Sequence, residues 1–407
     1  MRVLFLSQIV PYPPHGGVLQ RGFNLVRELG RHAEVHLLAF VHPDVLPTEK
    51  HLADSRKALS EFCATVEYFS LWPKQSKLHT LAAAGLSTVS SDPFSVIAHR
   101  SAGFRRSVEE HLARLAFDVL HVDTIALCQF IPDGCKVPTV VTHHNIESML
   151  MARRAAVERR PLHKRFLARE SAKLEHYERV NSPRVDGNVM MSVPDAAALE
   201  RLAPGVRMAI VPNGVDTAYF TPGEGETPAL IYTGGMNMFA NNDAVMHFLR
   251  EIWPAIRAAH PEVVFYAVGQ DPPAELGAIA EQDPRVIVTG YVDDVRPYVR
   301  KAAVYVVPLR VGGGTRLKVL DAMAMGKAMV STSIGCEGIN VADGTHLVIA
   351  DAPDDFARSV VALLNDPGRR RELSRAARAR VEELYAWPVV GRQLLDAYRA
   401  AISVPRH

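Results

Sequence analysis

Three consecutive glycines stand where an apolar run meets a helical pattern, in the stretch VPLRVGGGTRLKVLDAMAMG at residues 307–326. Gly312, Gly313 and Gly314 follow the apolar run 303–309, which has the pattern of a strand. Glycines permit backbone conformations in which several N–H groups converge, and the start of a helix adds partial positive charge. The turn is therefore predicted to bind an anion.

Basic side chains surround this turn. Arg310 precedes the glycines, Thr315 marks the expected start of the helix, and Arg316 and Lys318 follow. A diphosphate matches these groups because it is compact, doubly charged and rich in hydrogen-bond acceptors. The alternative is a tight turn with solvated basic residues, in which Lys318 and Asp321 form a surface pair. The stretch is not a P-loop, because the Gly-Lys-Ser/Thr ending is missing.

Short apolar runs alternate with helical patterns along the chain. The predicted strands are residues 3–7, 34–40, 65–71, 118–123, 138–144, 187–192, 206–212, 229–234, 263–269, 286–290, 303–309, 328–332 and 346–350. Continuous apolar strands separated by helices predict parallel sheets covered on both faces. Two such series predict an α/β protein with two doubly wound, Rossmann-like domains facing a central cleft, where ligands bind beyond the carboxyl ends of the strands.

The domain boundary is predicted in PNGVDTAYFTPGEGETP, which is rich in Pro, Gly and Thr and lacks an amphipathic period. We expect a first domain at 1–212, a linker at 213–228 and a second domain at 229–385. The amphipathic tail at 386–407 forms a helix that packs on its own domain or crosses back to the first. The pattern leaves both possibilities open.

The bulk composition is that of an ordinary soluble protein, with 407 residues, 48% hydrophobic and 22% charged. A net charge of only +2 gives no indication of nucleic-acid binding. The four cysteines form no metal-spaced cluster, and no run is long and apolar enough to span a bilayer. The N-terminus begins with a strand pattern rather than a signal peptide. We therefore expect a cytoplasmic protein, either free or at the inner face of the membrane.

Several motifs together resemble the retaining family 4 glycosyltransferases of GT-B fold, in the branch with a GGGTRLK turn. They are VVPLRVGGGTRLKVLDAMAMGKAMVST, PYPPHGG, THHNIES, PNGVDTAYFTP and VTGYVDDVRPYVRKAAVYVVPLR. The resemblance implies a nucleotide-diphosphate sugar as donor substrate, no cofactor and no metal. In that family two glutamates eight positions apart occupy the turn segment. Asp321 matches the second, which binds ribose hydroxyls, whereas Gly313 replaces the first, which lies near the sugar.

The resemblance also implies the other donor contacts. The loop 234–243, which contains Gly235, lacks the Arg and Lys that often grip the diphosphate, so Arg316 and Lys318 are expected to neutralise it. The nucleotide base is expected at Tyr291 and Val292, mainly through backbone. Four further donor-binding residues are predicted: Arg310, Gly312, Gly314 and Thr315. Glu337 follows strand 328–332 and is either a partner of sugar hydroxyls or a surface residue.

Residues of the first domain are expected to border the acceptor. They are Gly16, Gly17 and Arg21, where a plain helix entry is the alternative. His143 and His144 are adjacent, so on extended backbone they point to opposite faces and only one reaches the cleft. The family pattern favours His144, with Asn145 beside it. The alternative is a structural histidine.

Two segments have the pattern of membrane contact. Residues 72–106 mix aromatic with basic side chains, and residues 151–170 place arginines around apolar positions. Such segments suit a lipid-linked acceptor, although solvated helix faces give the same pattern.

We conclude that the sequence predicts a hexosyl-type glycosyltransferase with Arg316, Lys318 and His144 as catalytic residues. It would move a sugar, with retention, to a hydroxyl of a glycan, a lipid-linked sugar or a small molecule, and no nucleic acid would be involved. The alternatives are a nucleotide-sugar epimerase of the same fold and a catalytically silent nucleotide-sugar binder.

Overall fold

The computed structural model describes residues 1–14, 16–311 and 316–403. The chain divides into two compact units, of which unit 1 contains Met1–Pro212 with Val390–His407 and unit 2 contains Asn213–Val389. Each unit has its own parallel sheet and its own core, so each is described separately.

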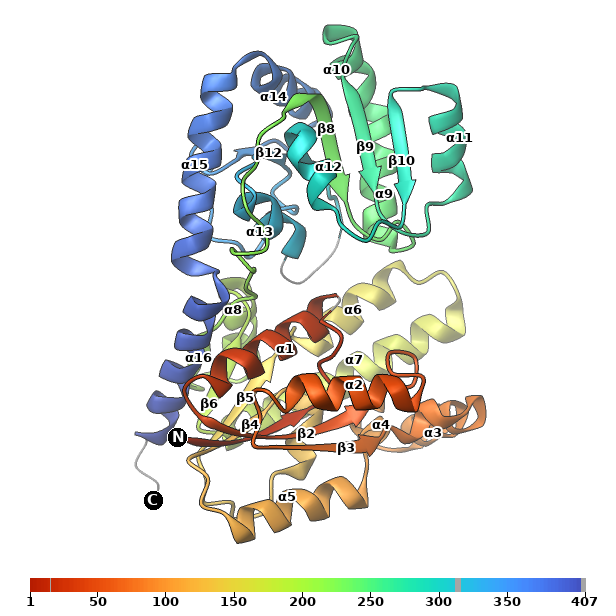
Figure 1. Ribbon diagram of the computed structural model, residues 1–407. Coiled ribbons are helices and arrows are strands. Elements are labelled where there is room, and N and C mark those ends of the chain that lie inside the picture. The colour runs from red at the N-terminus through yellow and green to blue at the C-terminus, as the bar shows by residue number, and fades with distance from the viewer. Residues whose placement is uncertain (15, 312–315, 404–407) are drawn as a thin grey trace. The chain divides into compact units, whose positions relative to one another are not determined.

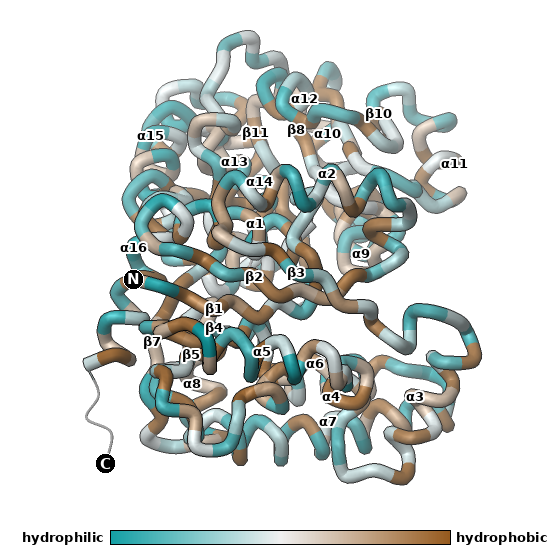
Figure 2. The backbone as a smooth tube through the Cα atoms, turned by 60° about the horizontal axis from the view of Figure 1, so that its bottom comes forward, coloured by the Kyte–Doolittle hydropathy of each residue, from teal (hydrophilic) through white to brown (hydrophobic). Residues whose placement is uncertain are grey.

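Unit 1 is built on a parallel sheet in the order β3-β2-β1-β4-β5-β6-β7. Its strands are β1 (Arg2–Ser7), β2 (Glu34–Val41), β3 (Thr65–Ser70), β4 (Val119–Val122), β5 (Thr139–His143), β6 (Gly187–Met190) and β7 (Met208–Ile210). The central strands are buried and mostly apolar, so brown predominates along β1 in Figure 2, while β2 and β4 each include one buried histidine, His36 and His121. The strand order reverses between β1 and β4, which makes this the switch point where open α/β sheets bind ligands.

Helices cover both faces of this sheet. In Figure 1, α1 and α2 lie on one side of it and α5 on the other. Phe104 and Val108 of α5 pack on Leu4, Leu6 and neighbouring residues of the sheet. The helices of unit 1 are α1 (Gly17–Gly30), α2 (Glu49–Leu59), α3 (Lys77–Val89), α4 (Phe94–Ala98), α5 (Ala102–Arg114), α6 (Glu147–Val157), α7 (Pro161–Asn181) and α8 (Val193–Leu202), with 3-10 turns η1 (Trp72–Gln75), η2 (Ile125–Phe130) and η3 (Ser182–Arg184).

Unit 2 is built on a second parallel sheet, in the order β10-β9-β8-β11-β12-β13. Its strands are β8 (Thr227–Thr233), β9 (Val264–Val268), β10 (Val286–Gly290), β11 (Ala302–Val307), β12 (Ala328–Ser331) and β13 (Val348–Ile349). Its helices are α9 (Phe239–His247), the π-helical turn η4 (Phe248–Ile252), α10 (Trp253–Ala259), α11 (Ala274–Gln282), α12 (Arg296–Lys301), α13 (Leu317–Ala324), α14 (Pro353–Asn365) and α15 (Pro367–Leu384). The order reverses between β8 and β11, so unit 2 has its own switch point.

The segment between the two sheets is fixed on unit 2 by backbone and side-chain contacts. The Val215 N–H donates to the carbonyl of Tyr385 at 2.8 Å. Arg378 of α15 donates to the carbonyls of Thr217 and Phe220, at 3.0 and 2.7 Å. The last helix, α16 (Trp387–Ile402), begins in unit 2 and belongs to unit 1 from Val390 onward.

The predicted fold class is confirmed, because every predicted strand run overlaps a strand of one of two doubly wound parallel sheets. The strand boundaries differ by one or two residues at most ends. Residues 118–123 were predicted as one strand, whereas β4 spans Val119–Val122 and leaves Asp123 beyond its carboxyl end.

Candidate functional site

Lys318, in the first turn of α13, is held by side chains from two other elements of unit 2. Its Nζ donates to Tyr232 Oη on β8 and to Asn241 Oδ1 on α9, both at 2.7 Å. The Tyr232 hydroxyl donates to the same Asn241 oxygen at 2.7 Å. The ammonium group also lies 4.0 Å from the centre of the Tyr232 ring, whose face attracts a cation. These partners are neutral, so they orient the charge of Lys318 without cancelling it.

Lys318 and Asp321 both titrate near neutral pH. Burial, together with the charge of Arg316, lowers the pKa of Lys318 to about 7, although Asp321 acts in the opposite direction. Burial raises the pKa of Asp321 to about 7, although the charge of Lys318 acts in the opposite direction. The protonation of this pair therefore responds to any charged ligand placed beside it.

The loop after β8 approaches Lys318 closely because it begins with glycine. A Cβ atom at Gly234 would lie 2.7 Å from Lys318 Nζ and 2.9 Å from Asn241 Nδ2. A Cβ atom at Gly269, after β9, would lie 1.9 Å from the carbonyl oxygen of Gly234. Asn241 Nδ2 donates to the carbonyl of Gly235 at 2.9 Å. The predicted donor residue Gly235 is thus linked to Lys318 through one amide side chain.

Arg316 occupies the N-cap position of α13 and is 9% exposed. Its Nε donates to the carbonyl of Ile334 at 3.3 Å, which fixes the guanidinium group against the loop after β12. The predicted glycine nest itself lies outside the described residues, at Gly312, Gly313, Gly314 and Thr315.

Arg310 is paired with an acidic side chain. It makes two hydrogen bonds with Asp243 of α9, at 3.1 and 2.5 Å, so its charge is already compensated. Glu337 is exposed in the loop after β12. Tyr291 is 69% exposed after β10, and the adjacent Val292 is half-buried against the core.

All the predicted donor residues that the structure describes lie at the carboxyl end of the unit 2 sheet. Gly235, Arg316, Lys318 and Asp321 gather at the switch point between β8 and β11. The other predicted residues follow β10, β11 and β12. They lie along the same edge of the sheet: Tyr291, Val292, Arg310 and Glu337.

In unit 1, the loop after β1 ends at Gly16, which has a φ of 84° and precedes the first residue of α1, Gly17. Both glycines are exposed, whereas Arg21 in the same helix is 1% exposed. The Arg21 guanidinium donates to the carbonyls of Val211 and Pro212, at 2.9 and 2.6 Å. Burial lowers the pKa of Arg21 to about 10, partly offset by the charge of Asp123. Arg21 therefore joins α1 to the chain after β7 rather than presenting its charge at the surface.

The two adjacent histidines have different surroundings. His143, the last residue of β5, is 1% exposed, and its Nε2 lies 2.9 Å from Asn188 Oδ1 on β6. Burial lowers the pKa of His143 to about 4, so it is a neutral structural residue. His144 lies past the strand end, with its Nε2 3.2 Å from Asp123 Oδ1. Asn145 follows it and is half-buried.

Three residues of these clusters were missed by the sequence analysis: Asp123, Tyr232 and Asn241. Asp123 was included in a predicted strand, although a carboxylate that ends a buried strand is a signal of a ligand-facing residue. Asn241 was overlooked because the loop 234–243 was searched for Arg and Lys, whereas here an amide positions a lysine from another element. Among the described residues, no group of three or more His, Cys, Asp or Glu side chains is placed to hold a metal ion.

Two doubly wound parallel units, each with candidate ligand-binding residues at its switch point, define a protein of GT-B fold. The chain is similar to sucrose-phosphate synthase from Thermosynechococcus elongatus, with a TM-score of 0.66, 17% identity and 98% coverage of each chain. It is also similar to Anabaena HepE, solved in complex with UDP, with a TM-score of 0.65, 13% identity and coverage of 97% of this chain and 99% of that chain.

The family follows from the sequence comparison. The model of Glycosyltransferase Family 4 matches residues 15–219, and that of Glycosyl transferases group 1 matches residues 227–366. The chain therefore belongs to glycosyltransferase family 4, as its motifs indicated. A curated relative, the phosphatidyl-myo-inositol mannosyltransferase of Mycolicibacterium smegmatis, is 27% identical over 312 residues, which are 72% of this chain and 74% of that protein.

Proposed function

We propose that the protein transfers a hexosyl group from a nucleotide-diphosphate sugar to an acceptor hydroxyl, with retention of anomeric configuration. The observation that supports this most directly is the placement of Lys318 and Arg316 at the start of α13. Two cationic groups, a helix N-terminus and the switch point of a parallel sheet coincide there. Each of these features favours a bound diphosphate.

In this scheme, the bond between the anomeric carbon and the diphosphate oxygen breaks, and the acceptor oxygen forms the new glycosidic bond on the same face of the sugar. The proton of the acceptor hydroxyl passes to an oxygen of the departing diphosphate. Lys318 and Arg316 stabilise the charge that develops on that diphosphate, and their fixed positions avoid reorganisation during the step. Asp321 binds the ribose hydroxyls, and Tyr291 and Val292 offer backbone to the base.

Residues of unit 1 take the acceptor side in this proposal. His144 and Asn145 offer hydrogen bonds to sugar hydroxyls, and Gly16 and Gly17 leave room for a ligand beside exposed N–H groups of α1. Arg21 stabilises this region from the buried side of α1, because its guanidinium donates to the backbone carbonyls of Val211 and Pro212. The named activity of the mycobacterial relative supports a lipid-linked acceptor such as a phosphoinositide among the possible classes.

The proposal is tested by incubating the purified protein with UDP-glucose, UDP-galactose and GDP-mannose, each with lipid-linked and soluble sugar acceptors. Chromatography should show a nucleoside diphosphate and a new glycoside, and the linkage should keep the configuration of the donor. Donor binding should also raise the melting temperature by mass action. Stabilisation by a nucleotide sugar with no product from any acceptor would favour a silent binder, and an isomerised nucleotide sugar would favour an epimerase.

We also propose that unit 1 contacts a membrane through helix α3. Leu78, Leu81 and Val89 are 77%, 68% and 81% exposed. At 3.6 residues per turn they share one face of the helix with Ala82 and Gly85. The outer face of α3 is therefore apolar, which is the reverse of the usual arrangement for a surface helix.

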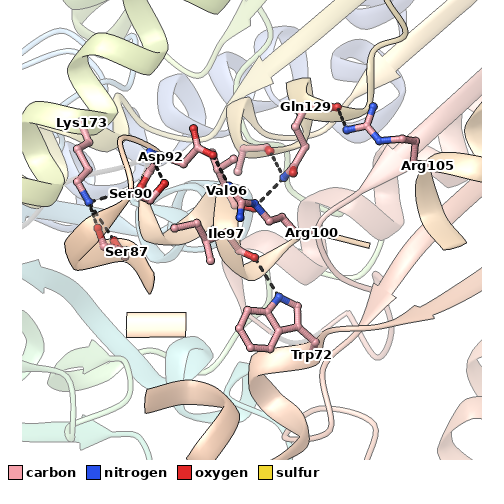
Figure 3. Close-up of polar contacts among 11 residues, drawn as sticks. Trp72, Ser87, Ser90, Asp92, Val96, Ile97, Arg100, Arg105, Gln129 and Lys173 are labelled. Atoms are coloured by element: carbon pink, nitrogen blue, oxygen red, sulfur yellow. Dashed lines mark hydrogen bonds and ion pairs between the residues drawn. The ribbon is translucent and has the colours of Figure 1, made fainter. Parts of the chain in front are cut away.

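The inner side of α3 is fixed by polar contacts (Figure 3). Lys173 Nζ donates to Ser87 Oγ at 3.1 Å. Glu170 Oε1 accepts from the Ser87 hydroxyl at 2.5 Å and from Lys173 Nζ at 2.8 Å. Before the helix, Trp72 Nε1 donates to the carbonyl of Ile97 at 3.0 Å. These contacts position α3 with its leucines outward.

The charge around this face suits anionic lipid. Between Glu67 and Asp92 the sequence has no acidic residue, and it includes Lys74 and Lys77. Leu162, 86% exposed at the start of α7, lies within the second predicted membrane segment. An apolar face with basic flanks is typical of helices that lie in a membrane interface. No helix in the described part of the chain is both long and apolar enough to cross a bilayer. We propose a cytoplasmic location at the inner face of the membrane.

A further inference from the structure

Tyr398 of the C-terminal helix α16 reaches the middle of the unit 1 sheet. Its side chain is fully buried, and its Oη lies 2.8 Å from Nδ1 of His121 on β4. The two rings also touch, with centroids 5.7 Å apart. A residue from the last helix thus contacts the strand that ends at the switch point.

His121 is the next member of this chain of contacts. It is completely buried and stacks on Phe5 of β1, with ring centroids 4.2 Å apart and planes 15° apart. Its Nε2 lies 3.3 Å from Thr142 Oγ1 and 3.9 Å from Asp123 Oδ1. Burial lowers the pKa of His121, so the ring is neutral and carries a single N–H.

The position of that proton follows from the surroundings. A proton on Nε2 points toward the carboxylate of Asp123, and it leaves the lone pair of Nδ1 to accept from the Tyr398 hydroxyl. The opposite tautomer would turn a lone pair toward a carboxylate, which is repulsive. We therefore assign the Nε2–H tautomer, in which the Tyr398 hydroxyl donates to Nδ1 and the Nε2–H faces Thr142 Oγ1 and the Asp123 carboxylate.

Asp123 lies between the two histidines, with its Oδ1 3.9 Å from His121 Nε2 and 3.2 Å from His144 Nε2. The other charged or titratable groups that interact with Asp123 are Arg21 of α1 and Tyr398 of α16. Burial alone would raise the pKa of Asp123, but its interactions with His144 and His121 outweigh burial and lower that pKa. Asp123 is thus a buried carboxylate that stays ionised because its neighbours are arranged around it.

We propose that Tyr398 and His121 are positioning residues that hold Asp123 against His144, so that the C-terminal helix determines how this histidine is presented. The proposal rests on the proposed function, in which His144 acts on the sugars. It goes beyond that function because it assigns a role to a helix and a strand residue that do not reach a ligand. Buried hydrogen-bond chains of this kind orient a functional group by fixing its tautomer and its angle.

The test is Tyr398→Phe, which keeps the ring and removes the hydroxyl. His121 then loses the hydroxyl that donates to Nδ1, so its Nε2–H tautomer is less well supported. The carboxylate of Asp123 is then less stabilised and ionises at a higher pH. We expect kcat with the donor found active above to fall about tenfold, with an unchanged KM for the donor. The acid limb of the pH–rate profile should move to higher pH. Long-range ¹H–¹⁵N spectra of the histidine rings should show a changed tautomer for one buried histidine.

Two further variants separate positioning from loss of stability. Tyr68→Phe in the same unit removes a hydroxyl that lies 2.9 Å from Ser55 Oγ, and it should lower the melting temperature without moving the pH profile. His121→Gln keeps an N–H donor near the position of Nε2. In the H121Q background, Tyr398→Phe should therefore have little further effect on the pH profile.

A Y398F variant whose pH profile and histidine spectra match the wild type, with only a lower melting temperature, would overturn the proposal. If Y398F does not fold, the pH–rate profiles of His121→Gln and His121→Ala are compared instead. Equal profiles for these two variants would overturn the proposal. Failure of the proposed function gives a different result, because the wild-type protein itself would then form no glycoside.

Discussion

Lys318 Nζ and Tyr232 Oη lie 2.7 Å apart, and the amine also sits over the ring of the same tyrosine. The contact holds a cation with neutral groups at the switch point of unit 2. Because burial lowers the pKa of Lys318 to about 7, its charge is incomplete at physiological pH until an anion is bound. Binding and protonation of this lysine should therefore be coupled.

We predict that a nucleoside diphosphate takes up a proton when it binds at pH 8. The free amine is mostly neutral above its pKa of about 7, and a neighbouring diphosphate raises that pKa. Near pH 6 the amine is already charged, so uptake should fade. Calorimetry of UDP or GDP in buffers of different ionisation enthalpy measures the number of protons. Lys318→Met should abolish the uptake, whereas Lys301→Met should keep it, and a wild-type uptake independent of pH would contradict the prediction.

The same pKa has a consequence for stability. The folded state favours the neutral amine, because the pKa is lowered from 10.5 in the unfolded chain to about 7. The contribution of this group should therefore increase the free energy of unfolding as pH rises from about 7 to about 10.5. Urea titrations at several pH values across this range give the free energy of unfolding of the wild type and of K318M. That free energy should rise less steeply with pH in the variant.

We predict that Arg316→Ala and Arg310→Ala differ strongly in activity. Arg316 lies at the N-cap of α13 beside Lys318, whereas Arg310 is paired with Asp243. Loss of Arg316 should lower kcat/KM for the nucleotide sugar about 100-fold, since charge stabilisation of the leaving group is typically of this size. Loss of the half-exposed Arg310 should lower kcat/KM by less than about threefold.

Melting temperatures of the two variants provide the control for this comparison. The Arg316 side chain donates to the carbonyl of Ile334, so its removal should cost about 1 kcal/mol of stability. That loss leaves the protein folded at assay temperature. Near-wild-type kinetics for R316A would exclude it from the diphosphate site.

Arg316 and Arg310 differ in whether an acidic partner compensates their charge, and this difference shows which features can be predicted from the sequence and which cannot. The strands, their parallel order and the ligand-binding ends follow from local apolar runs and their helical spacers. Lys318 was predicted because it follows a glycine turn at a strand end, and Asp321 because it matches a carboxylate of the family motif. Arg310 has equally suggestive neighbours in the chain, but its partner Asp243 is 67 residues away.

The same limit applies in unit 1. Arg21 follows a glycine pair and was predicted at the acceptor, yet its guanidinium is bound by carbonyls 190 and 191 residues later. Whether a charge is free for a ligand depends on such distant partners, which a local pattern does not contain. His144 shows the opposite case, because strand alternation alone required the two adjacent histidines to diverge, and the structure shows which one meets Asp123.

We predict that Asp123→Asn lowers kcat about 100-fold with little change of melting temperature. The amide keeps the size of the carboxylate but removes the charge beside His144. Loss of a carboxylate that orients a functional histidine typically lowers activity 10- to 100-fold. Asp186→Asn is the matched control. Asp186 accepts the Thr139 N–H at 2.8 Å at the amino end of β5, the opposite end of the same sheet. A loss of activity in D186N as large as in D123N would show that sheet stability, not the Asp123–His144 contact, is responsible.

We predict that Leu78→Ser with Leu81→Ser removes lipid binding and leaves the fold intact. Both side chains are more than two-thirds exposed, so their replacement removes no core packing. Each buried leucine contributes about 1.5 to 3 kcal/mol to insertion, so the double variant should bind liposomes of anionic lipid at least tenfold more weakly in flotation assays. A double variant of Val180→Ser with Val193→Ser controls for general loss of hydrophobicity, because these two side chains are 45% and 67% exposed elsewhere on unit 1.

Two outcomes would show that α3 is not a membrane contact. In the first, L78S/L81S floats with liposomes as well as the wild type does. In the second, light scattering without lipid shows that the wild type dimerises through this face. Activity on a soluble acceptor should be unchanged in both double variants, because the lipid contact concerns delivery of the acceptor and not the chemistry at Lys318.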